Sequence, residues 1–573
     1  MLSVTNPGPA AKDTIRTIKR RTMVNVRVFP ALLCAGLFSL LTLGSLPSTA
    51  RAARIFNVRD HGATGRKDDD ARAAIQKTID ACAAGGGGIV LFPPGLYTSG
   101  TLHLRSHVHI ELAQGATLFA SIDPAAYDYG SMVSKAALFL GEDLEDVGFQ
   151  GAGSVDGQAQ YEWRLDDFEE GFDHKTMMQK LGKPLLRTFP KDFPKRQVLP
   201  HLVWLGRCRD VHFEGLNFLH SPSWTFALYA CGDVSFQRLY VYSSLKEAVW
   251  ADGIDLDGCR DVSIANCSIE TGDDCVALVS ENTWGPALPC ENISITNCRL
   301  STASAGVKFS EGNHAGVRNV RVRDCLFNNV NRAAVFITAQ GGSISDVVFS
   351  DLTIDCRRFD WFWAGDAQPF RCRSYRLREI NPAAPKETEP PAGAIRGLTF
   401  SNIVAHAQGC TMFYGHPECW LDRLTLENVQ LYVSTDPAAP YDTAEHALDF
   451  RRVTNLKLKN VEVRWEQPFL STWQSPLYLE DIRGLEIDGF SAGPARPGLP
   501  VLDLRQISGA NIRHARALPG TGVFAQVTGP ASREIHFEDN DFTQAKVPYA
   551  LAPGVPVTAV QGIGKAPTAV SPP

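Results

Sequence analysis

An apolar-x-apolar triplet followed by a small polar turn recurs along most of this chain. The segments DVSIANCSI, NISITNCRL, NVRVRDCLF, GLTFSNIVA, RLTLENVQL and NLKLKNVEV are copies of one pattern. Side chains alternate along each copy so that every second one points inward, which predicts a short strand. The typical step is 23 to 32 residues, and the triplets begin at Val147, Val211, Val234, Val262, Ile293, Val320, Val347, Leu398, Leu424, Leu456, Leu485, Ile512 and Ile535.

A period of this length is typical of a solenoid, whose single units cannot bury their apolar side alone. Successive coils must therefore stack, with parallel strands about 4.8 Å apart and apolar ladders pointing inward. A leucine-rich repeat has a similar period, but its fixed Leu spacing is absent here and the segments between triplets resemble further strands and turns. The repeat predicts an all-β protein, a parallel β-helix in which Val262, Ile293, Val320 and Val347 lie in register.

The remaining segments complete the predicted organisation. Residues 53–145 are expected to hold an N-terminal cap and the first coils, with a short capping helix from 70 to 82 whose Ile75, Ile79 and Cys82 share one face. The β-helix is predicted over 146–550, with insertions near 158–200 and 357–395 that border a cleft. Pro, Gly and Ala dominate 551–573, which predicts a disordered tail.

The first 52 residues have the pattern of a signal peptide. Seven basic residues and one acidic residue surround an apolar run from Ala31 to Leu43, and Ala50-Arg51-Ala52 supplies a cleavage site. The run is short for a membrane anchor, which is the alternative interpretation, and either Met1 or Met23 is the start. Cleavage predicts a secreted or periplasmic protein without stable membrane insertion.

Charge and cysteine content narrow the possible functions. Removal of residues 1–52 leaves 49 Lys and Arg against 61 Asp and Glu, a net charge of −12. Nucleic acid is therefore not an expected partner, because phosphate binding needs a basic face. Thirteen of the 14 cysteines remain, an odd number, so at least one cannot pair within the chain. Four of them recur at equivalent repeat positions and are predicted to stack as buried thiols, namely Cys267, Cys298, Cys325 and Cys356.

Carboxylates are densest in WADGIDLDGC and the following ETGDDCVAL. Asp252 and Asp274 are 22 residues apart, about one coil, so stacking is expected to bring Asp252 beside Asp273 and Asp274. Glycoside hydrolysis needs one protonated and one ionised carboxyl, and crowding of like charges separates their pKa values. These three aspartates are the predicted catalytic residues. A turn-capping role is predicted instead for Asp255, Asp257 and Asp261.

At these residues the chain resembles polygalacturonase-like glycoside hydrolases. That family carries N-T-D-G and then G-D-D one coil later, and this chain has Ala251-Asp252-Gly253 and Gly272-Asp273-Asp274. HSPSWTF, from His220, and FNVRDHGATGRKDDDARAAIQ, from Phe56, also resemble family segments. The resemblance spans about 55–440 and implies a right-handed parallel β-helix (solenoid) that cleaves pectic polysaccharides with inversion. It also implies that Asp273 is the general acid and that Asp252 and Asp274 activate water.

Inversion needs space for water, so acid and base are expected roughly 6.5 to 9.5 Å apart.

Two family motifs are replaced in this chain. Ser304-Ala305-Gly306 stands for G-H-G, and Phe336-Ile337-Thr338 stands for R-I-K, the motif that holds a uronate in the family. Weak or no activity on plain polygalacturonate is therefore predicted, with rhamnogalacturonan or rhamnoside substrates as alternatives. The predicted substrate-binding residues are Lys308, His314, Arg332 and Trp284, and Trp361 and Trp363 are further candidates for sugar stacking.

Two other functions remain open at this stage. A polysaccharide lyase shares the β-helix and uses calcium-bound aspartates with a Lys or Arg base. Lys308, beside the three aspartates, is a candidate for that base, so a lyase is one alternative. A noncatalytic carbohydrate-binding β-helix is the second alternative, although a binder has no need of crowded negative charge. No metal-binding motif occurs in the sequence, so no metal or cofactor is expected. The expected partner is a polysaccharide or oligosaccharide, and the protein is expected to be a monomer.

Overall fold

The computed structural model describes residues 54–129, 132–159, 163–167, 186–190, 200–245, 248, 250–359, 367–435 and 444–562. Residues 1–52, Trp361, Trp363 and the residues from 563 lie outside these ranges. The predictions of a signal peptide and of stacking by those two tryptophans therefore lie outside the described residues. Within the described part no helix is long and apolar enough to cross a membrane.

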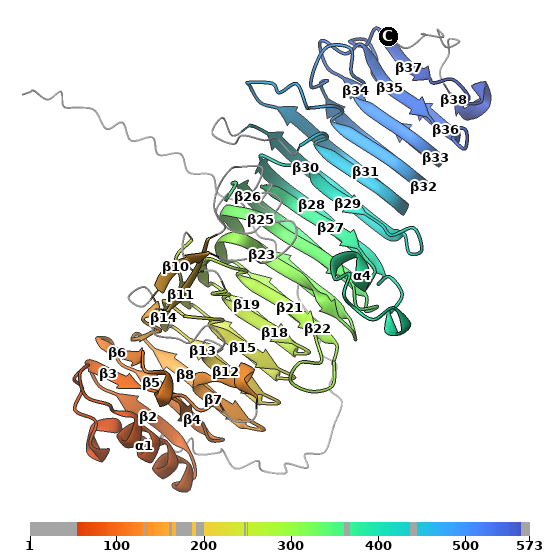
Figure 1. The fold of residues 1–573 in the computed structure, drawn as a ribbon. Helices are drawn as coiled ribbons and strands as arrows, with labels where there is room; N and C mark the ends of the chain where they lie inside the picture. Colours follow the sequence, from red (N-terminus) through yellow and green to blue (C-terminus); the bar gives the residue numbers. More distant parts are fainter. Residues whose placement is uncertain are drawn as a thin grey trace, which may run out of the picture. The chain divides into compact units, whose positions relative to one another are not determined.

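Three parallel ladders of strands make up the fold of residues 54–562, and each coil contributes one strand to each ladder (Figure 1). Strands specific to the first ladder are β4 (Leu102–His103), β7 (Ala137–Glu142), β12 (His201–Gly206), β15 (Phe226–Tyr229), β18 (Ile254–Asp257), β21 (Val276–Ser280), β27 (Gln368–Ser374), β29 (Thr411–Tyr414), β35 (Val523–Thr528) and β37 (Val547–Leu551).

The second ladder carries the recurring triplets. Its own strands are β1 (Ile55–Asn57), β2 (Gly88–Phe92), β5 (Val108–Leu112), β8 (Glu145–Gly151), β13 (Arg209–Glu214), β16 (Gly232–Gln237), β19 (Arg260–Ala265), β22 (Cys290–Thr296), β24 (Val317–Arg323), β36 (Arg533–Glu538) and β38 (Val560–Gln561). Those of the third ladder are β3 (Gly95–Ser99), β6 (Ala116–Ala120), β9 (Ser154–Asp156), β14 (Asn217–Leu219), β17 (Tyr240–Tyr242), β20 (Ser268–Thr271) and β34 (Arg516–Ala517).

Longer strands bend from one ladder into the next. They are β23 (Arg299–Asn313), β25 (Leu326–Thr338), β26 (Ile344–Cys356), β28 (Ile395–Ala407), β30 (Leu421–Val433), β31 (Leu448–Trp465), β32 (Leu477–Ala492) and β33 (Leu502–Arg513). Outside the ladders, β10 (Trp163–Asp167) and β11 (Leu186–Pro190) form an antiparallel pair. The helical segments are η1 (Val58–His61), α1 (Arg72–Ala84), η2 (Pro124–Ala126), η3 (Val133–Lys135), α4 (Leu377–Ile380), η4 (Lys386–Thr388) and η5 (Val557–Ala559).

The register of the second ladder confirms the predicted repeat. Val262 pairs with Ile293, Ile293 with Val320, and Val320 with Val347, each on a successive coil. One member of the series was misplaced by two residues, because Leu485 pairs with Ala510 and not with Ile512. Side chains in register also touch from coil to coil: the rings of Phe149 and Phe213 stack with centroids 4.9 Å apart, close to the strand spacing.

Turns between the ladders are held by polar side chains that repeat with the coils. Asn266, Asn297 and Asn319 adopt positive φ, the left-handed conformation that Asn tolerates better than most residues. The amide of Asn297 donates to the side chain of Asn266 at 2.7 Å, one coil away. Asn460, Asn428 and Asn402 repeat this arrangement farther along, with distances of 2.9 Å. These amide chains fix each turn against the next.

The described cysteines carry free thiols, and the predicted stack is confirmed. Cys267, Cys298 and Cys325 are 3% exposed and Cys356 is 2% exposed. The thiols of Cys267 and Cys298 contact backbone carbonyls of their own and neighbouring coils. They therefore behave as small apolar residues of the core.

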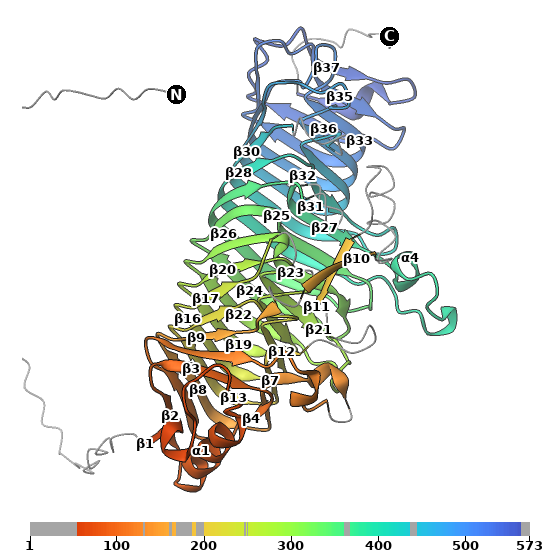
Figure 2. The same cartoon turned by 60° about the vertical axis from the view of Figure 1, so that its left-hand side comes forward.

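Three segments differ from the predicted organisation in detail. The helix expected at 70–82 is α1, and it buries Ile75, Ile79 and Cys82 as predicted. The segment 357–395 is not entirely an insertion, because it contains β27, a regular strand of the first ladder between β25 and β29; α4 follows it and stands outside the strands in Figure 2. The tail begins later than 551, because Val560 in β38 pairs with Ile535. A short strand among Pro and Gly residues was not recognised.

We predict that Ile293→Ala lowers the melting temperature of the protein markedly. Ile293 is 1% exposed and has paired residues on both sides in the ladder, so truncation leaves a cavity that costs about 2–5 kcal/mol. Ser294→Ala, on the outward face of the same strand, should change stability by less than about 0.5 kcal/mol. Differential scanning calorimetry of both variants tests this, and equal melting temperatures would contradict the assigned core.

Candidate active site

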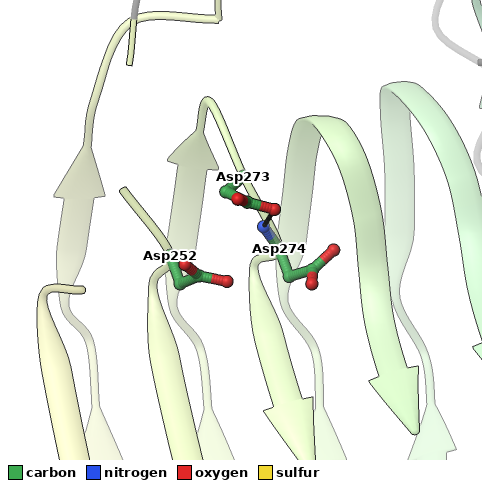
Figure 3. A group of neighbouring side chains, drawn as sticks. All are labelled: Asp252, Asp273 and Asp274. Atoms are coloured by element: carbon green, nitrogen blue, oxygen red, sulfur yellow. Dashed lines mark hydrogen bonds between the residues drawn. The ribbon is translucent and has the colours of Figure 1, made fainter. Parts of the chain in front are cut away.

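The three predicted catalytic carboxyls meet at one corner of two neighbouring coils. Asp252 lies two residues before β18, and Asp273 and Asp274 lie in the turn between β20 and β21. Because Ile254 of β18 pairs with Val276 of β21, Asp252 and Asp274 occupy the same position on successive coils. One oxygen from each of the three carboxyls lies within 4.8 Å of the others, and Figure 3 shows the side chain of Asp252 directed toward the other two.

Burial and mutual repulsion dominate the electrostatics of this corner. Asp252, Asp273 and Asp274 are only 5%, 7% and 2% exposed. Burial raises the pKa of Asp252 well above its ordinary value, and the nearby carboxyls of Asp273, Asp255 and Asp274 raise it further. The ammonium of Lys308 opposes this shift in part. Burial and the neighbouring carboxyls therefore both favour the protonated form of Asp252.

Asp274 has a different environment from Asp252. Its Oδ1 accepts hydrogen bonds from the hydroxyl of Ser304 at 2.7 Å and from the backbone amide of Ala305 at 2.9 Å. Its Oδ2 lies 3.3 Å from Nζ of Lys308. The carboxyl of Asp274 is therefore held by two hydrogen bonds and one ion pair. The Ser304-Ala305 pair, which stands where the family has G-H-G, thus holds Asp274 in place.

The backbone of the Gly272–Asp274 turn is also fixed by hydrogen bonds. The amide of Asp274 donates to Oδ1 of Asp273 at 2.9 Å, the dashed line in Figure 3. The hydroxyl of Thr271 donates to the carbonyl of Asp273 at 2.7 Å, and the hydroxyl of Thr302, one coil farther, contacts the same carbonyl. The turn that carries both aspartates is therefore preorganised.

The expected separation between acid and base is not met. The carboxyl oxygens approach within 4.8 Å, whereas about 6.5 to 9.5 Å was expected for an inverting pair. Asp252 and Asp274 occupy one position on adjacent coils, which are separated by the strand spacing of about 4.8 Å, and Asp273 directly precedes Asp274 in the chain.

Two aspartates predicted to cap turns lie in the site instead. Asp255 and Asp257 belong to strand β18, point outward from the core and line the same pocket as the catalytic candidates. Oδ2 of Asp255 is buried without a hydrogen-bond partner, and burial followed by the charges of Asp274 and Asp273 raises its pKa well above the ordinary value. Burial raises the pKa of Asp257 to about 7. Asp257 also accepts a hydrogen bond from the backbone amide of Glu281 at 2.8 Å. Asp261 lies in β19 with a φ of 55° and accepts a hydrogen bond from the side-chain amide of Asn292.

The pocket is acidic and aromatic. It encloses about 260 Å³ and is lined by Trp224, Trp250, Asp252, Asp255, Asp257, Asp273, Asp274, Ala277, Val279, Glu281, Thr283, Trp284, Lys308 and Ser310. Six of these described lining residues are carboxylic acids, and Lys308 is the single cation among them. Because Lys308 is paired with Asp274, the pocket has little positive charge to offer an anionic sugar.

The predicted substrate-binding residues divide into two groups. Lys308 and Trp284 line the pocket, although Trp284 is only 7% exposed and packs mainly against other aromatic rings. His314 is exposed and Arg332 is half-buried, and neither is among the lining residues. These two residues were proposed from their type alone, and no motif in the sequence indicated that they lie near the pocket.

Trp224 and Trp250 were missed as pocket residues. Trp224 lies two residues before Phe226 of β15, and Phe226 pairs with Ile254 of β18. Trp224 therefore occupies on its coil the position that Asp252 occupies on the next one. The repeat itself held this signal, because HSPSWTF lies one coil before WADGIDL.

The triplet that replaces R-I-K contributes no charge to the outer face. Phe336 points into the core, where its ring stacks on Phe309 at 4.6 Å. The outward positions of β25 are therefore Val335 and Ile337, which places the comparison with R-I-K one residue earlier than predicted. Both residues are apolar.

Comparisons with known proteins bear on the family of this chain. Residues 89–356 match the family model of glycosyl hydrolases family 28, and residues 55–112 match that of rhamnogalacturonase A/epimerase, pectate lyase-like. An exopolygalacturonase of Platanus acerifolia is 26% identical over 310 residues, which cover 52% of this chain and 72% of the relative. A probable polygalacturonase of Vitis vinifera is 26% identical over 356 residues, which cover 56% and 67% of the two chains.

Among solved structures, an exopolygalacturonase of Thermotoga maritima superposes with a TM-score of 0.55 at 21% identity, covering 72% of this chain and 93% of the other. At that identity the similarity bears on the fold. The family match spans the coils that carry Asp252, Asp273 and Asp274. Residues 89–356 thus match the model of glycosyl hydrolases family 28, and this match and the polygalacturonase relatives indicate a glycoside hydrolase.

Proposed function

We propose that this protein hydrolyses glycosidic bonds in pectic or related plant cell-wall polysaccharides or oligosaccharides, with Asp252, Asp273 and Asp274 as its catalytic residues. The main support is the crowding of three buried carboxyls within 4.8 Å in a pocket of about 260 Å³. Such crowding keeps one carboxyl protonated beside an ionised one, and glycoside hydrolysis needs both states.

In the proposed mechanism Asp273 protonates the leaving oxygen, and Asp252 and Asp274 hold the attacking water. Asp274 suits its part because Ser304, Ala305 and Lys308 fix the position of its carboxyl. Asp252 favours a proton in the free site, so its part requires that this proton pass to Asp273 when substrate binds.

The close carboxyl spacing is, taken alone, that of a retaining pair. Inversion is the outcome implied by the family resemblance, and proton NMR of the first product distinguishes the two.

The further features of the proposal concern fold and location. We propose a right-handed winding, as in nearly all parallel strand crossovers, with α1 covering the apolar end of the first coils. Burial of Ile75, Ile79 and Cys82 on one face of α1 supports that cover. Residues 1–52 are proposed to direct export to the periplasm or the medium, and the protein is proposed to act as a monomer.

We also propose that the sugar in the pocket is uncharged. A uronate would place its carboxylate among six acidic side chains, with one lysine that is already paired. Val335 and Ile337 supply no replacement for the missing basic residues on β25. Neutral sugars avoid this repulsion and can donate hydroxyl hydrogen bonds to the carboxylates.

Each of Asp252→Asn, Asp273→Asn and Asp274→Asn is predicted to reduce kcat by at least about a hundredfold, because general acid or base catalysis contributes a hundredfold to ten-thousandfold. Substrate binding and melting temperature should change little, since Asn keeps size and shape. Reducing-sugar release from a panel of pectic oligosaccharides measures the loss. A near-normal rate for Asp273→Asn would show that the acid is another residue.

The same panel separates hydrolysis from the lyase alternative. A lyase forms unsaturated ends that absorb in the near ultraviolet and loses activity with chelator. Hydrolysis by the three carboxyls predicts no such absorbance and full activity in chelator.

Polygalacturonate is predicted to be a poor substrate compared with its methyl ester. Esterification removes the negative charge and leaves the sugar and linkage unchanged, so the comparison isolates the charge of the substrate. The rates of both polymers are measured under the same conditions. Turnover of unesterified polygalacturonate at an ordinary enzymatic rate, roughly 1 to 1000 per second, would contradict the uncharged-sugar proposal.

The stability of the protein is predicted to fall as pH rises toward 7 and above because of Asp257. Its folded pKa of about 7 lies above the ordinary 3.8, so its contribution is fully present below 3.8 and is lost as pH rises through 7. Each pKa unit corresponds to about 1.4 kcal/mol. Asp257→Asn should therefore melt higher than the parent at pH 8 and equally at pH 4. The matched control is Asp261→Asn at an exposed site, which should show no such difference.

A further inference from the structure

A cluster of aromatic side chains covers the outer face of the first ladder beside the acidic pocket. We call it the aromatic plug and define it by Ala137, Trp204, Ala227, Tyr229 and Trp284, with Trp224 at its edge. The ring of Trp284 meets those of Trp204 and Trp224 with centroids 5.8 and 5.9 Å apart. Trp204 is fully buried and Tyr229 is 2% exposed, so the plug is filled with side chains and excludes water.

The plug begins one coil away from the carboxyls. Ala227 of β15 pairs directly with Asp255 of β18, and Tyr229 pairs with Asp257. Trp224 and Trp284 line the pocket with one side and belong to the plug with the other. The pocket therefore ends at the plug on the side of the earlier coils.

Polar contacts hold the plug in place. Trp284 belongs to the loop between β21 and β22, which folds back over the earlier coils so that its Nε1 donates to the hydroxyl of Ser134 at 3.0 Å. The hydroxyl of Tyr229 donates to the carbonyl of Pro286 in the same loop at 3.0 Å. The loop is thus fixed at two points, one at Ser134 in η3 and one at Tyr229 in β15.

A second pocket lies beyond the plug. It encloses about 410 Å³ beside β4 and β7 and is lined by residues that include His103, Arg105, Lys135 and Glu142. The ammonium of Lys135 lies 4.6 Å from the centroid of the Trp204 ring, so this pocket directly borders the plug. The plug therefore divides the outer face of the first ladder into two separate pockets. A continuous groove for a polymer would need this face to be unobstructed.

We propose that the acidic pocket accepts the end of a glycan chain and that the protein removes terminal sugars. A polymer bound by an interior residue must leave the pocket on both sides, and the plug occupies one of these paths. This inference rests on the proposed glycosidase activity and specifies where along a chain that activity acts.

Defined oligosaccharides of increasing length, labelled at one end, test the proposal on the whole protein. Chain-end cleavage shortens each oligosaccharide stepwise, so the first product is always one terminal unit and its complement. Early appearance of internal fragments from the parent protein would overturn the chain-end proposal. Absence of cleavage in every oligosaccharide would instead contradict the proposed function.

Variants of the plug give a second readout. Trp284→Ala opens the boundary of the pocket and should shift products from terminal units toward internal fragments. Trp473→Ala removes a tryptophan that is also buried but lies between β31 and β32, and it should keep the parental product pattern despite lower stability. An unchanged pattern in Trp284→Ala would overturn the role of the plug. If that variant does not fold, Trp284→Phe, which shortens the side chain and keeps the core apolar, replaces it.

Discussion

Hydrogen bonding between strands of successive coils, in strict register, is the constraint on which the rest of this structure depends. Val262 pairs with Ile293, and the neighbouring residues of β19 and β22 are matched in the same register. The core forms from like residues above one another, as in the stacked rings of Phe149 and Phe213. Polar residues at equivalent turn positions also stack from coil to coil, as in the hydrogen bond between Asn297 and Asn266. Stability and geometry therefore come from one repeated interaction.

The site uses this register to hold charges that would otherwise separate. Asp252 and Asp274 occupy one position on adjacent coils, and the ladder keeps them together although burial and the neighbouring carboxyls raise the pKa of Asp252. Ser304 and Lys308, on the next coil, contact the carboxyl of Asp274. Three adjacent coils thus provide the crowded carboxyls and the groups that hold one of them in place.

The sequence was sufficient for features that follow from periodicity. The ladder positions and the meeting of Asp252 with Asp273 and Asp274 derive from counting residues per coil, and helix α1 derives from apolar residues that share one helical face. Features that depend on which side of a strand a residue faces were missed. Asp255 was assigned to a turn because Asp is common in turns, yet alternation along β18 directs it into the pocket.

The repeat pattern in the sequence also did not predict where the loops between strands pack. Trp284 was expected to stack on sugar, and no local signal showed that its loop folds back onto Tyr229.

The buried thiols have a consequence for biogenesis. The described part holds thirteen free cysteines, twelve of them buried. A chain delivered unfolded to an oxidising compartment would expose all of them where disulfides form readily. Winding of coils competes with that oxidation, and burial ends the competition because it suppresses the reactive thiolate. Folding of a solenoid can propagate from whichever coil forms first, since each new coil needs only its neighbour. Fast folding would therefore bury the thiols before they form non-native disulfides.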